Sequence, residues 1–478
     1  YGGPLIDLHG RVLGLLVPLS PHGEGAVAGV EWYDSGVGFA VPIGDIGPAL
    51  ERMKAGADQH AGQLGIAMAS GNAFIDPAKI AAVRPNSPAA RAGFAAGDRI
   101  VMVERQTIRT INDLRFALGP RYAGDAINVT VARDDETIAQ TIALSGPLGP
   151  FRHAFLGLLP MRALGGTDVD EADQPAGVEV RHVYLGSPAS QEGILAGDRI
   201  VRIGTVEVAT PAAAIDAMNG YTVGDAVPIE VERGNQSLDV EVTAKALPVD
   251  LPPDLPPAHD AAALAGEVGE DIQLGARELN LPEFANACQV FVPDAVGYRI
   301  PSGVIVILAD DSTAPRTALQ TWEPLCQQHD LLVAIPSPTD EGNWSTRDAE
   351  YLVRLLMTLT RDYPVDRSRI VVAGQGRGVR LAARLAFGNS AAVTGLALMG
   401  APLPRGIRPP DATANRRLAV CLAPGAGTNQ AAASRASLRQ LREAGYNTTQ
   451  LPAVGVTGTL EAEHYRELAR WTDTLDRF

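Results

Sequence analysis

The chain has 478 residues, of which 46% are hydrophobic, so it is long enough for about three domains with packed cores and is not disordered as a whole. Its formal net charge is −15, and such an acidic chain repels phosphate backbones, which argues against nucleic acid as a main partner. No apolar run approaches the roughly 20 residues of a membrane-spanning helix.

Three sparse cysteines give no sign of a disulfide framework or a zinc site. They are Cys288, Cys326 and Cys421, and no two of them form a CxxC pair. We therefore predict small buried side chains at these positions and expect no metal and no cofactor. No charged segment followed by an apolar stretch is visible at the start of the sequence, so any secretion signal is expected upstream of Tyr1.

Residues 1–57 predict short strands followed by a helix over 46–54. Residues 1–5 (YGGPL) and 36–43 (GVGFAVPI) resemble the end of the trypsin-like domain of HtrA-type serine proteases. In that family Ser-Gly-Gly-Pro-Leu carries the nucleophile and part of the oxyanion hole. Here Tyr1 stands at the serine position, and a phenol on a rigid ring cannot replace that hydroxyl. The family's histidine and aspartate would lie upstream, so the resemblance implies a β-barrel remnant without a catalytic residue.

An internal repeat follows, over residues 58–149 and 150–247. Residues 87–89 (SPA) and 97–101 (GDRIV) recur at 187–189 and 197–201, both at the same offset. Each copy is expected to open with a short strand at a Leu-Gly pair and to close on two alternating strands after a short helix. The expected elements are strands 80–83, 126–132 and 138–143 with helix 111–118 in the first copy, and strands 178–183, 227–231 and 238–242 with helix 212–218 in the second.

This order of elements resembles two tandem PDZ domains, small α+β domains that HtrA-type proteases often carry. The resemblance implies that the Leu-Gly turn presents N–H groups to a peptide's terminal carboxylate and that the next strand accepts the peptide as an added strand. Glycine is needed because the carboxylate must approach the backbone. The expected peptide-binding residues are Leu64, Gly65, Ile66, Leu114, Phe116 and Leu118 in the first copy and Leu156, Gly157, Leu158, Ile215 and Met218 in the second. Core packing is the alternative for Leu64, Ile66, Leu156 and Leu158. Asp98 and Asp198 are expected to hold the GDRI turn.

Two segments depart from the repeat. Residues 168–173 (DVDEAD) form an acidic insertion that lacks the glycine and the last glutamate of an EF-hand, so we expect a solvated loop. Residues 248–257 (PVDLPPDLPP) open a Pro-rich linker over 248–270, which is expected to be extended and semi-rigid.

From residue 271 onward, strands alternate with helices, which predicts an α/β domain over 271–478 with a parallel sheet. The strand at 304–309, the strand-turn-helix at 369–383 and the last helix resemble the α/β-hydrolase superfamily, which implies a doubly wound sheet. The expected strands are 304–309, 331–335, 369–373, 393–399 and 418–423, and the expected helices are 346–361, 379–387, 432–444 and 461–478.

The catalytic positions of that superfamily are vacant in this sequence. Its Gly-x-Ser-x-Gly elbow reads GQGRG at 374–378, so Gly376 stands at the nucleophile position. The oxyanion loop reads ADDS at 309–312, and its carboxylates would oppose an oxyanion. No acid occurs from 412 through 442, and no histidine occurs at 454–459. His464 lies beyond, in the last helix, and is expected to be a surface or capping residue. The glycine spacing also fails the nucleotide-binding pattern GxGxxG.

Three functional hypotheses remain. The leading one is a pseudoenzyme that binds extended or C-terminal peptide segments through PDZ-like domains, in a scaffold or quality-control role related to HtrA-type proteases. The second is a serine endopeptidase or esterase whose catalytic half lies upstream or that uses an unrecognised serine. The third is architectural, a homo-oligomer assembled by the PDZ-like domains. The family resemblance implies an extracytoplasmic setting, in the periplasm or cell envelope.

Overall fold

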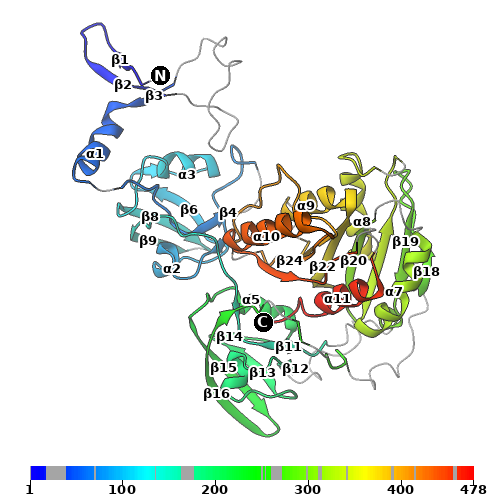
Figure 1. Ribbon diagram of the computed structural model, residues 1–478. Helices are drawn as coiled ribbons and strands as arrows, with labels where there is room; N and C mark the ends of the chain where they lie inside the picture. The colour runs from blue at the N-terminus through cyan, green and yellow to red at the C-terminus, as the bar shows by residue number, and fades with distance from the viewer. Residues whose placement is uncertain are drawn as a thin grey trace. The chain divides into compact units, whose positions relative to one another are not determined.

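The computed structural model of the chain describes residues 2–17, 39–56, 58–68, 72–134, 136–162, 177–248, 251–252, 255–259, 272–297, 300–309, 315–340, 343–388, 392–413, 416–455 and 460–478. It separates into two compact units, Tyr1–Leu148 and Gly149–Phe478. Figure 1 draws the first unit in blue to cyan and the second in green to red.

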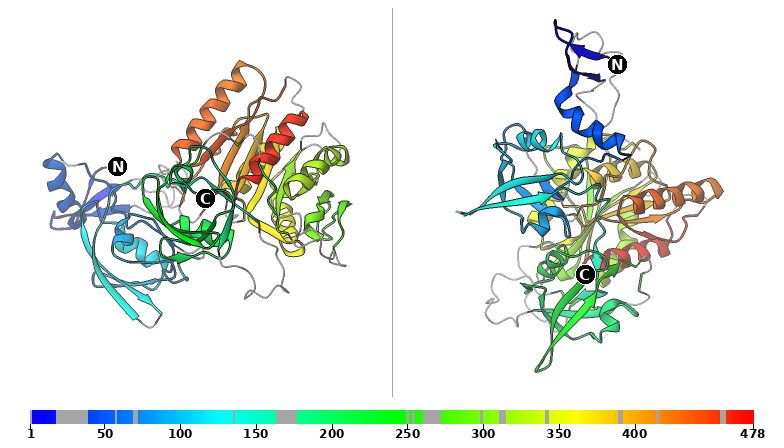
Figure 2. Two further views of the ribbon diagram at one scale, coloured as in Figure 1. Left: turned by 90° about the horizontal axis from the view of Figure 1, so that it is seen from below. Right: turned by 90° about the vertical axis from the view of Figure 1, so that its left-hand side faces the viewer.

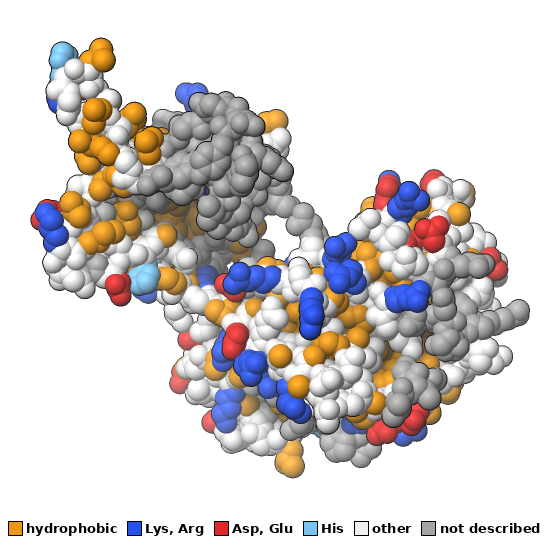
Figure 3. All heavy atoms as spheres, turned by 45° about the horizontal axis from the view of Figure 1, so that its top comes forward, with side chains coloured by type: hydrophobic (Ala, Val, Ile, Leu, Met, Phe, Trp, Pro, Cys, Tyr) orange, Lys and Arg blue, Asp and Glu red, His pale blue; other side chains and the backbone are white. Residues whose placement is uncertain are grey.

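The first unit begins with a small open sheet. Antiparallel strands β1 (Pro4–Ile6), β2 (Val12–Val17) and β3 (Phe39–Pro42) lie side by side, and α1 (Ile43–Lys54) follows directly. Many apolar side chains of this segment are exposed, and apolar surface is visible there in Figure 3. No closed barrel is seen among the described residues, so the trypsin-like remnant is not confirmed. Tyr1 and residues 36–38, which carry part of that resemblance, lie outside the described residues.

The first repeat folds into two small sheets and two helices. Strand β4 pairs with β5, and the second sheet has the order β7-β6-β8-β9. Helix α3 begins where the Thr110 hydroxyl accepts the N–H of Asp113, in a capping box. The elements are β4 (Ile66–Met68), β5 (Ile80–Val83), α2 (Pro88–Arg91), β6 (Arg99–Val103), β7 (Gln106–Thr107), α3 (Ile111–Leu118), β8 (Ala126–Arg133) and β9 (Glu136–Ala143).

The second repeat has the same order of elements inside the second unit. Its main sheet has the order β11-β12-β13-β15-β16, with β14 on β13, and β10 pairs with β17. Alternate residues of β15, Val227, Ile229 and Val231, are buried, as their period of two predicts. The elements are β10 (Ala154–Phe155), β11 (Leu158–Pro160), β12 (Val178–Val183), α4 (Pro188–Gln191), β13 (Arg199–Ile203), β14 (Val206–Glu207), α5 (Pro211–Met218), β15 (Ala226–Arg233), β16 (Gln236–Thr243) and β17 (Lys245–Ala246).

An eight-stranded sheet forms the rest of the second unit, in the order β18-β19-β21-β20-β22-β23-β24-β25. The strands from β21 to β25 are parallel, but β19 pairs antiparallel with β21, and β18 with β19. The prediction of a parallel sheet is therefore wrong at the edge formed by β18 and β19. The strands are β18 (Gly275–Glu278), β19 (Cys288–Val292), β20 (Ser302–Leu308), β21 (Leu331–Pro336), β22 (Val365–Gln375), β23 (Gly395–Met399), β24 (Ala419–Ala423) and β25 (Asn447–Gln450).

Helices cover both faces of this sheet, and each face has its own apolar core. Helices α8, α9 and α10 pack on one core, and α7 and α11 pack on the other. The left view of Figure 2 shows α10 (orange) and α11 (red) on opposite sides of the sheet. The helices are α6 (Asp294–Gly297), α7 (Pro315–His329), α8 (Asp348–Asp362), α9 (Val379–Phe387), α10 (Thr428–Glu443) and α11 (Ala462–Asp473).

The last helix is shorter than predicted. The sequence predicts a helix to Phe478, but α11 ends at Asp473, and the following residues leave the helix.

Earlier expectations for single residues are confirmed here. His464 caps α11, because its Nδ1 accepts the N–H of Glu461 at 3.0 Å. All three cysteines are free and buried.

Candidate functional site

The two repeats contain matching turns at Gly65 and Gly157. Their φ angles are +79° and +101°, a region that side chains rarely adopt. A Cβ at Gly65 would lie 2.2 Å from the Ser87 Cβ, and one at Gly157 would lie 2.1 Å from the Ser187 Cβ. Both positions therefore require glycine, for space as well as for backbone conformation.

Neighbouring backbone groups hold each turn in place. The carbonyl oxygen of Gly65 accepts the N–H of Arg84 at 2.8 Å, and that of Gly157 accepts the N–H of Tyr184 at 2.9 Å. The next strands, β4 and β11, pair with β5 and β12 in the same register and with the same bulge. The two turns and strands are therefore built alike.

The predicted side chains of the first repeat divide between core and groove. Leu64 and Leu114 are buried in the core, whereas Ile66 and Leu118 are partly buried against it. Phe116 is 75% exposed and is not in that cluster. Leu64 thus has the core role that was left open for it, Leu114 also lies in the core, and Ile66 and Leu118 remain at its edge.

In the second repeat the groove is occupied by the last residue of the sequence. The N–H groups of Gly157 and Leu158 donate to the main-chain oxygen of Phe478, at 3.2 and 3.0 Å, and the N–H of Phe478 donates to the Leu158 oxygen at 3.0 Å. The Phe478 side chain is fully buried. It belongs to one apolar cluster with Leu156, Leu158, Ile215 and Met218, which are the groove residues that the sequence predicts.

Phe478 was not among the predicted groove residues, because the sequence pattern assigns it to the last helix. The available signal was the composition of the last five residues, in which a bulky apolar residue follows Asp476 and Arg477. In the structure these residues run from the end of α11 into the groove.

A buried charge cluster lies just before this segment. Arg162 and Arg181 of the second repeat both bond to the Asp473 carboxylate, Arg181 at 3.2 Å. His329 Nδ1 lies 3.1 Å from the other carboxylate oxygen. Burial alone would raise the pKa of Asp473, but the two guanidinium groups outweigh it and hold that pKa well below its usual range.

Asp476 lies in the same cluster but is less well paired. Arg162 Nε donates to its Oδ2 at 3.2 Å, and the structure gives Oδ1 no hydrogen-bond partner. Burial raises the pKa of Asp476 despite the neighbouring arginines. The cluster therefore favours the charged form of Asp473 and disfavours that of Asp476.

The GDRI aspartates are structural, as predicted. Asp98 accepts the N–H of Ala95 at 2.9 Å and forms a two-pronged ion pair with Arg133. Asp198 does the same with Leu195 and Arg233. Each carboxylate thus ties its turn to the β8 or β15 strand end and lies among framework contacts.

The turn after β22 keeps the shape of a strand-to-helix elbow. Gly376 follows the strand with φ +51°, and α9 begins three residues later. A Cβ at Gly378 would lie 2.2 Å from the Leu308 oxygen, so the turn packs tightly on β20. No hydroxyl, thiol or carboxylate occupies the elbow position.

His464, in addition to its capping bond, has Nε2 3.2 Å from the Ala453 oxygen. Residues 310–312 lie outside the described residues.

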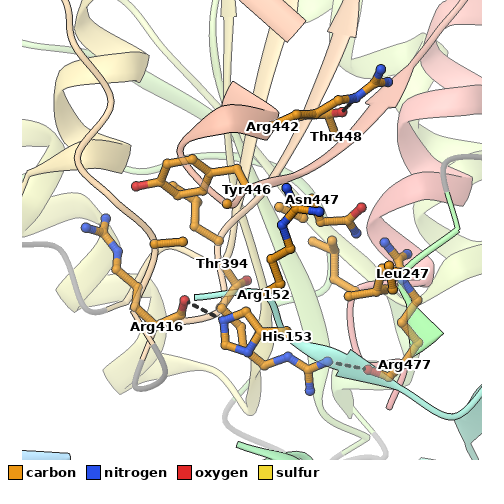
Figure 4. Close-up of a pocket in the computed structure, with 17 residues that line it drawn as sticks. Arg152, His153, Leu247, Thr394, Arg416, Arg442, Tyr446, Asn447, Thr448 and Arg477 are labelled. Carbon is orange, nitrogen blue, oxygen red and sulfur yellow. Dashed lines mark hydrogen bonds between the residues drawn. The ribbon is translucent and has the colours of Figure 1, made fainter. Parts of the chain in front are cut away.

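A second feature of this unit is a cavity of about 450 Å³ with a basic lining (Figure 4). The Arg417 side chain donates one hydrogen bond, from Nη2 to the Arg477 main-chain oxygen at 3.1 Å. Its Nη1 is buried and has no partner in the structure. Burial and the nearby Arg477 lower the pKa of Arg417 to about 10. Burial, and to a smaller extent the charge of Arg417, lowers the pKa of His153 to about 3. The arginines of the lining are Arg152, Arg416, Arg417, Arg442 and Arg477, His153 lies beside them, and none of the lining residues is acidic.

Neither a membrane-spanning helix nor a metal site is found among the described residues. No helix there is long and apolar enough to cross a membrane. Across the same ranges, no group of three or more His, Cys, Asp or Glu side chains could hold a metal ion.

Comparison with known proteins identifies the repeats. The family model described as PDZ domain matches residues 62–144 and 163–244. A probable DegP-like periplasmic serine endoprotease from Halomonas elongata is 28% identical over 255 residues, covering 49% of this chain and 52% of that protein. The periplasmic serine endoprotease DegP of Escherichia coli K12 is 25% identical over 209 residues, 42% of each chain. The chain thus spans about half the length of these relatives.

Solved structures match separate parts of the chain. The HtrA3 PDZ domain bound to a phage-derived ligand (FGRWV) is 26% identical and covers 20% of this chain and 86% of its own, with a TM-score of 0.17. A thermostable esterase is 14% identical and covers 52% of this chain and 70% of its own, with a TM-score of 0.32.

Proposed function

Because the chain contains two PDZ domains, PDZ1 and PDZ2, and is similar to HtrA-type endoproteases, we propose that it binds extended or C-terminal peptide segments through PDZ1. The peptide would add as a strand to β4, and Gly65 and Ile66 would offer their N–H groups to its terminal carboxylate. Ile66 and Leu118 would contact its apolar side chain, over a floor formed by Leu64 and Leu114.

The observation that carries this proposal is the occupied groove of PDZ2. A main-chain segment lies there with three hydrogen bonds to Gly157 and Leu158. PDZ1 has the same turn, register and bulge. Among the described residues, no comparable main-chain segment bonds to Gly65 and Ile66. A foreign peptide would therefore find in PDZ1 the contacts that Phe478 makes in PDZ2.

We further propose a non-catalytic role for the remaining parts of the chain. Residues 2–56 would correspond to the last strands and helix of a trypsin-like domain, since they have the same strand-strand-strand-helix order. The α/β part would be a pseudohydrolase, because glycine occupies its elbow and both nitrogens of His464 face backbone groups. Fluorophosphonate labelling of the purified chain, read by intact mass, tests this. An unmodified mass is expected, and a labelled serine would favour the enzyme hypothesis.

The setting that we propose is extracytoplasmic, in a scaffold or quality-control role. Its support is that the similar curated proteins are named as periplasmic. Assembly of several copies through the PDZ domains is a separate proposal, and light scattering after size exclusion would measure it directly.

Peptide binding is tested by fluorescence anisotropy on the full chain. The probe is a pool of labelled decapeptides that end in Val, Leu, Ile or Phe with a free carboxylate. Gly65→Ala should weaken binding at least ~10-fold, because the added Cβ closes the turn against Ser87. The matched control is Gly97→Ala, which carries similar backbone strain at φ +96° but has no atom within 4 Å of the new Cβ. Equal affinities of the wild type and both variants, or no binding at millimolar peptide, would refute the proposal.

A further inference from the structure

We propose that residues 474–478 are the resident ligand of PDZ2, so that this domain holds a segment of its own chain while PDZ1 remains the groove for foreign peptides. The inference rests on the proposed peptide-binding chemistry but assigns a partner and a selectivity to the second groove.

The main-chain contacts are those of a bound peptide. Two neighbouring N–H groups, of Gly157 and Leu158, converge on one Phe478 oxygen, and the Phe478 N–H returns a bond to Leu158. Two converging N–H groups hold this oxygen, and the returned bond adds the segment to the edge of β11. These three bonds join main-chain atoms only. They therefore fix the position and the direction of the segment without any contribution from its side chains.

The side chain contributes a second contact. Phe478 is fully buried in the PDZ2 core cluster, against Leu158, Ile215 and Met218. Complete burial of a phenyl ring is among the larger apolar contributions that one side chain can make. The pocket therefore selects a bulky apolar residue at this position.

Two arginines extend the recognition upstream. Arg162 contacts Asp476, two residues before Phe478, and both Arg162 and Arg181 contact Asp473. The repeat offset places Ala81 of PDZ1 where PDZ2 has Arg181, because both follow the same register. Ser70 aligns with Arg162 in sequence, although it lies outside the described residues. PDZ2 thus holds Asp473, five residues before Phe478, with two arginines, and PDZ1 has alanine at the position of one of them.

The geometry also gives the internal segment an advantage over free peptides. Asp473 ends α11 and is held by His329, so only a few residues separate this anchored point from the groove. Such a short tether gives an effective concentration on the order of millimolar or higher. A free peptide of ordinary micromolar affinity would not displace it.

The test uses the full chain in a Gly65→Ala background, so that only PDZ2 is measured. The probe is a labelled peptide with the sequence of residues 469–478 (ARWTDTLDRF) and a free last carboxylate. Phe478→Ala should bind this probe at least ~10-fold more tightly than the unmodified background, because the internal ligand is weakened. Adding Gly157→Ala to that variant should abolish the gain. Phe478→Leu, which keeps an apolar side chain, should stay close to the background.

A second measurement guards against misfolding of a variant. Hydrogen exchange at the amides of Gly157 and Leu158 should be slow in the unmodified chain and at least ~10-fold faster in Phe478→Ala. Equal probe affinity with and without Phe478, or unprotected amides in the unmodified chain, would overturn the inference. A probe that binds PDZ2 in Phe478→Ala while the peptide pool fails to bind PDZ1 would instead overturn only the proposed function.

A second inference comes from a different observation, the basic cavity of Figure 4. The lining contains five arginines and no acidic residue. Arg416 and Arg477 donate to the backbone oxygens of Phe387 and Thr474, whereas Arg417 Nη1 is buried without a hydrogen-bond partner in the structure. The Asp216 carboxylate interacts electrostatically with Arg417, but Asp216 does not line the cavity. Buried donors of like charge are costly unless an anion satisfies them.

We infer that this cavity binds a small organic anion with an apolar body, of the aryl phosphate class. Leu247, Leu418 and Leu475 supply apolar wall beside the arginines. A volume of about 450 Å³ suits a ligand of this size. Arg442 has only one bond to the wall, from its Nε to the Thr448 hydroxyl at 2.7 Å.

Calorimetric titration with phenyl phosphate tests the cavity, against sodium chloride at matched ionic strength. Arg417→Gln and Arg152→Gln should each weaken binding at least ~10-fold. The matched control is Arg435→Gln, an exposed arginine of α10 outside the lining, which should leave the affinity unchanged. No heat of binding at millimolar phenyl phosphate, or an equal loss in all three variants, would overturn the inference.

Discussion

Asparagine at position 473 should release the segment 474–478 from PDZ2. The Asp473 carboxylate is almost fully buried and is shared by Arg162, Arg181 and His329. Without its charge, the buried Arg181 would lose its carboxylate partner, and Arg162 would keep only Asp476 and Asp330. Removal of one partner from a buried ion pair costs about 3–5 kcal/mol. At about 1.4 kcal/mol per factor of ten, the docking equilibrium should shift by roughly two to nearly four orders of magnitude.

Asp476→Asn is the matched control for this change. Burial raises the pKa of Asp476, so docking makes its charged form less favourable, and its Oδ1 has no partner in the structure. Losing the charge there should cost less than about 1 kcal/mol. Each substitution removes one carboxylate charge, at positions three residues apart. The expected losses of docking free energy nevertheless differ by several kcal/mol.

Hydrogen exchange at the Gly157 and Leu158 amides measures both variants, because the Phe478 oxygen protects these two groups. Exchange should accelerate at least ~100-fold in Asp473→Asn and remain near the wild-type rate in Asp476→Asn. Comparable rates in both variants, or faster exchange in Asp476→Asn, would refute the assignment of charge within the cluster.

The pH dependence has a definite sign. The folded pKa of Asp473 is lowered, so its contribution is present above the unfolded value of 3.8 and is lost as the pH falls through the folded value. Asp476 acts in the opposite direction, because its folded pKa is raised and its ionisation opposes docking. The acid loss of amide protection should therefore disappear in Asp473→Asn.

Three further predictions follow from single residues. Gly376→Ser should give no turnover of a p-nitrophenyl ester, because both His464 nitrogens face backbone groups; measurable release of nitrophenol would contradict this. For His153, burial lowers the folded pKa to about 3 from 6.5, so the unfolded state alone takes up a proton as the pH falls below 6.5. Urea unfolding should therefore show a loss of about 2 kcal/mol between pH 7 and pH 5 that His153→Gln removes, and an unchanged pH slope in the variant would count against it. Burial raises the pKa of Cys326 above its usual range, so that thiol should not react with Ellman's reagent until denaturant is added, and rapid reaction in buffer would be the contrary result.

Local patterns in the sequence predicted the repeats well. The alternation in 126–132 and 227–231 gives strands with buried alternate residues, because a period of two places them on one face. The role of Asp98 was also accessible, since a carboxylate in a tight turn bonds to nearby N–H groups. These features depend on neighbours within a few residues.

Features that depend on distant partners were not accessible. Strand β18 (GARE) is a polar edge strand without an apolar pattern, and its antiparallel pairing was missed together with β19. The periodicity of 461–478 continues through Phe478, so it predicts a helix there. The helix ends at Asp473 because the following residues gain contacts with Leu158 and Arg162, which no local pattern encodes.

The bonds between Leu158 and Phe478 also bear on how the protein folds. They join two points with most of the second unit between them in sequence, so they raise the contact order of that unit. During synthesis PDZ2 emerges long before α11, and its groove cannot receive residues 474–478 until the α/β part is complete. Groove closure should thus be a late step in folding, and until then PDZ2 is open to other peptides with an apolar end, including those of neighbouring unfinished chains.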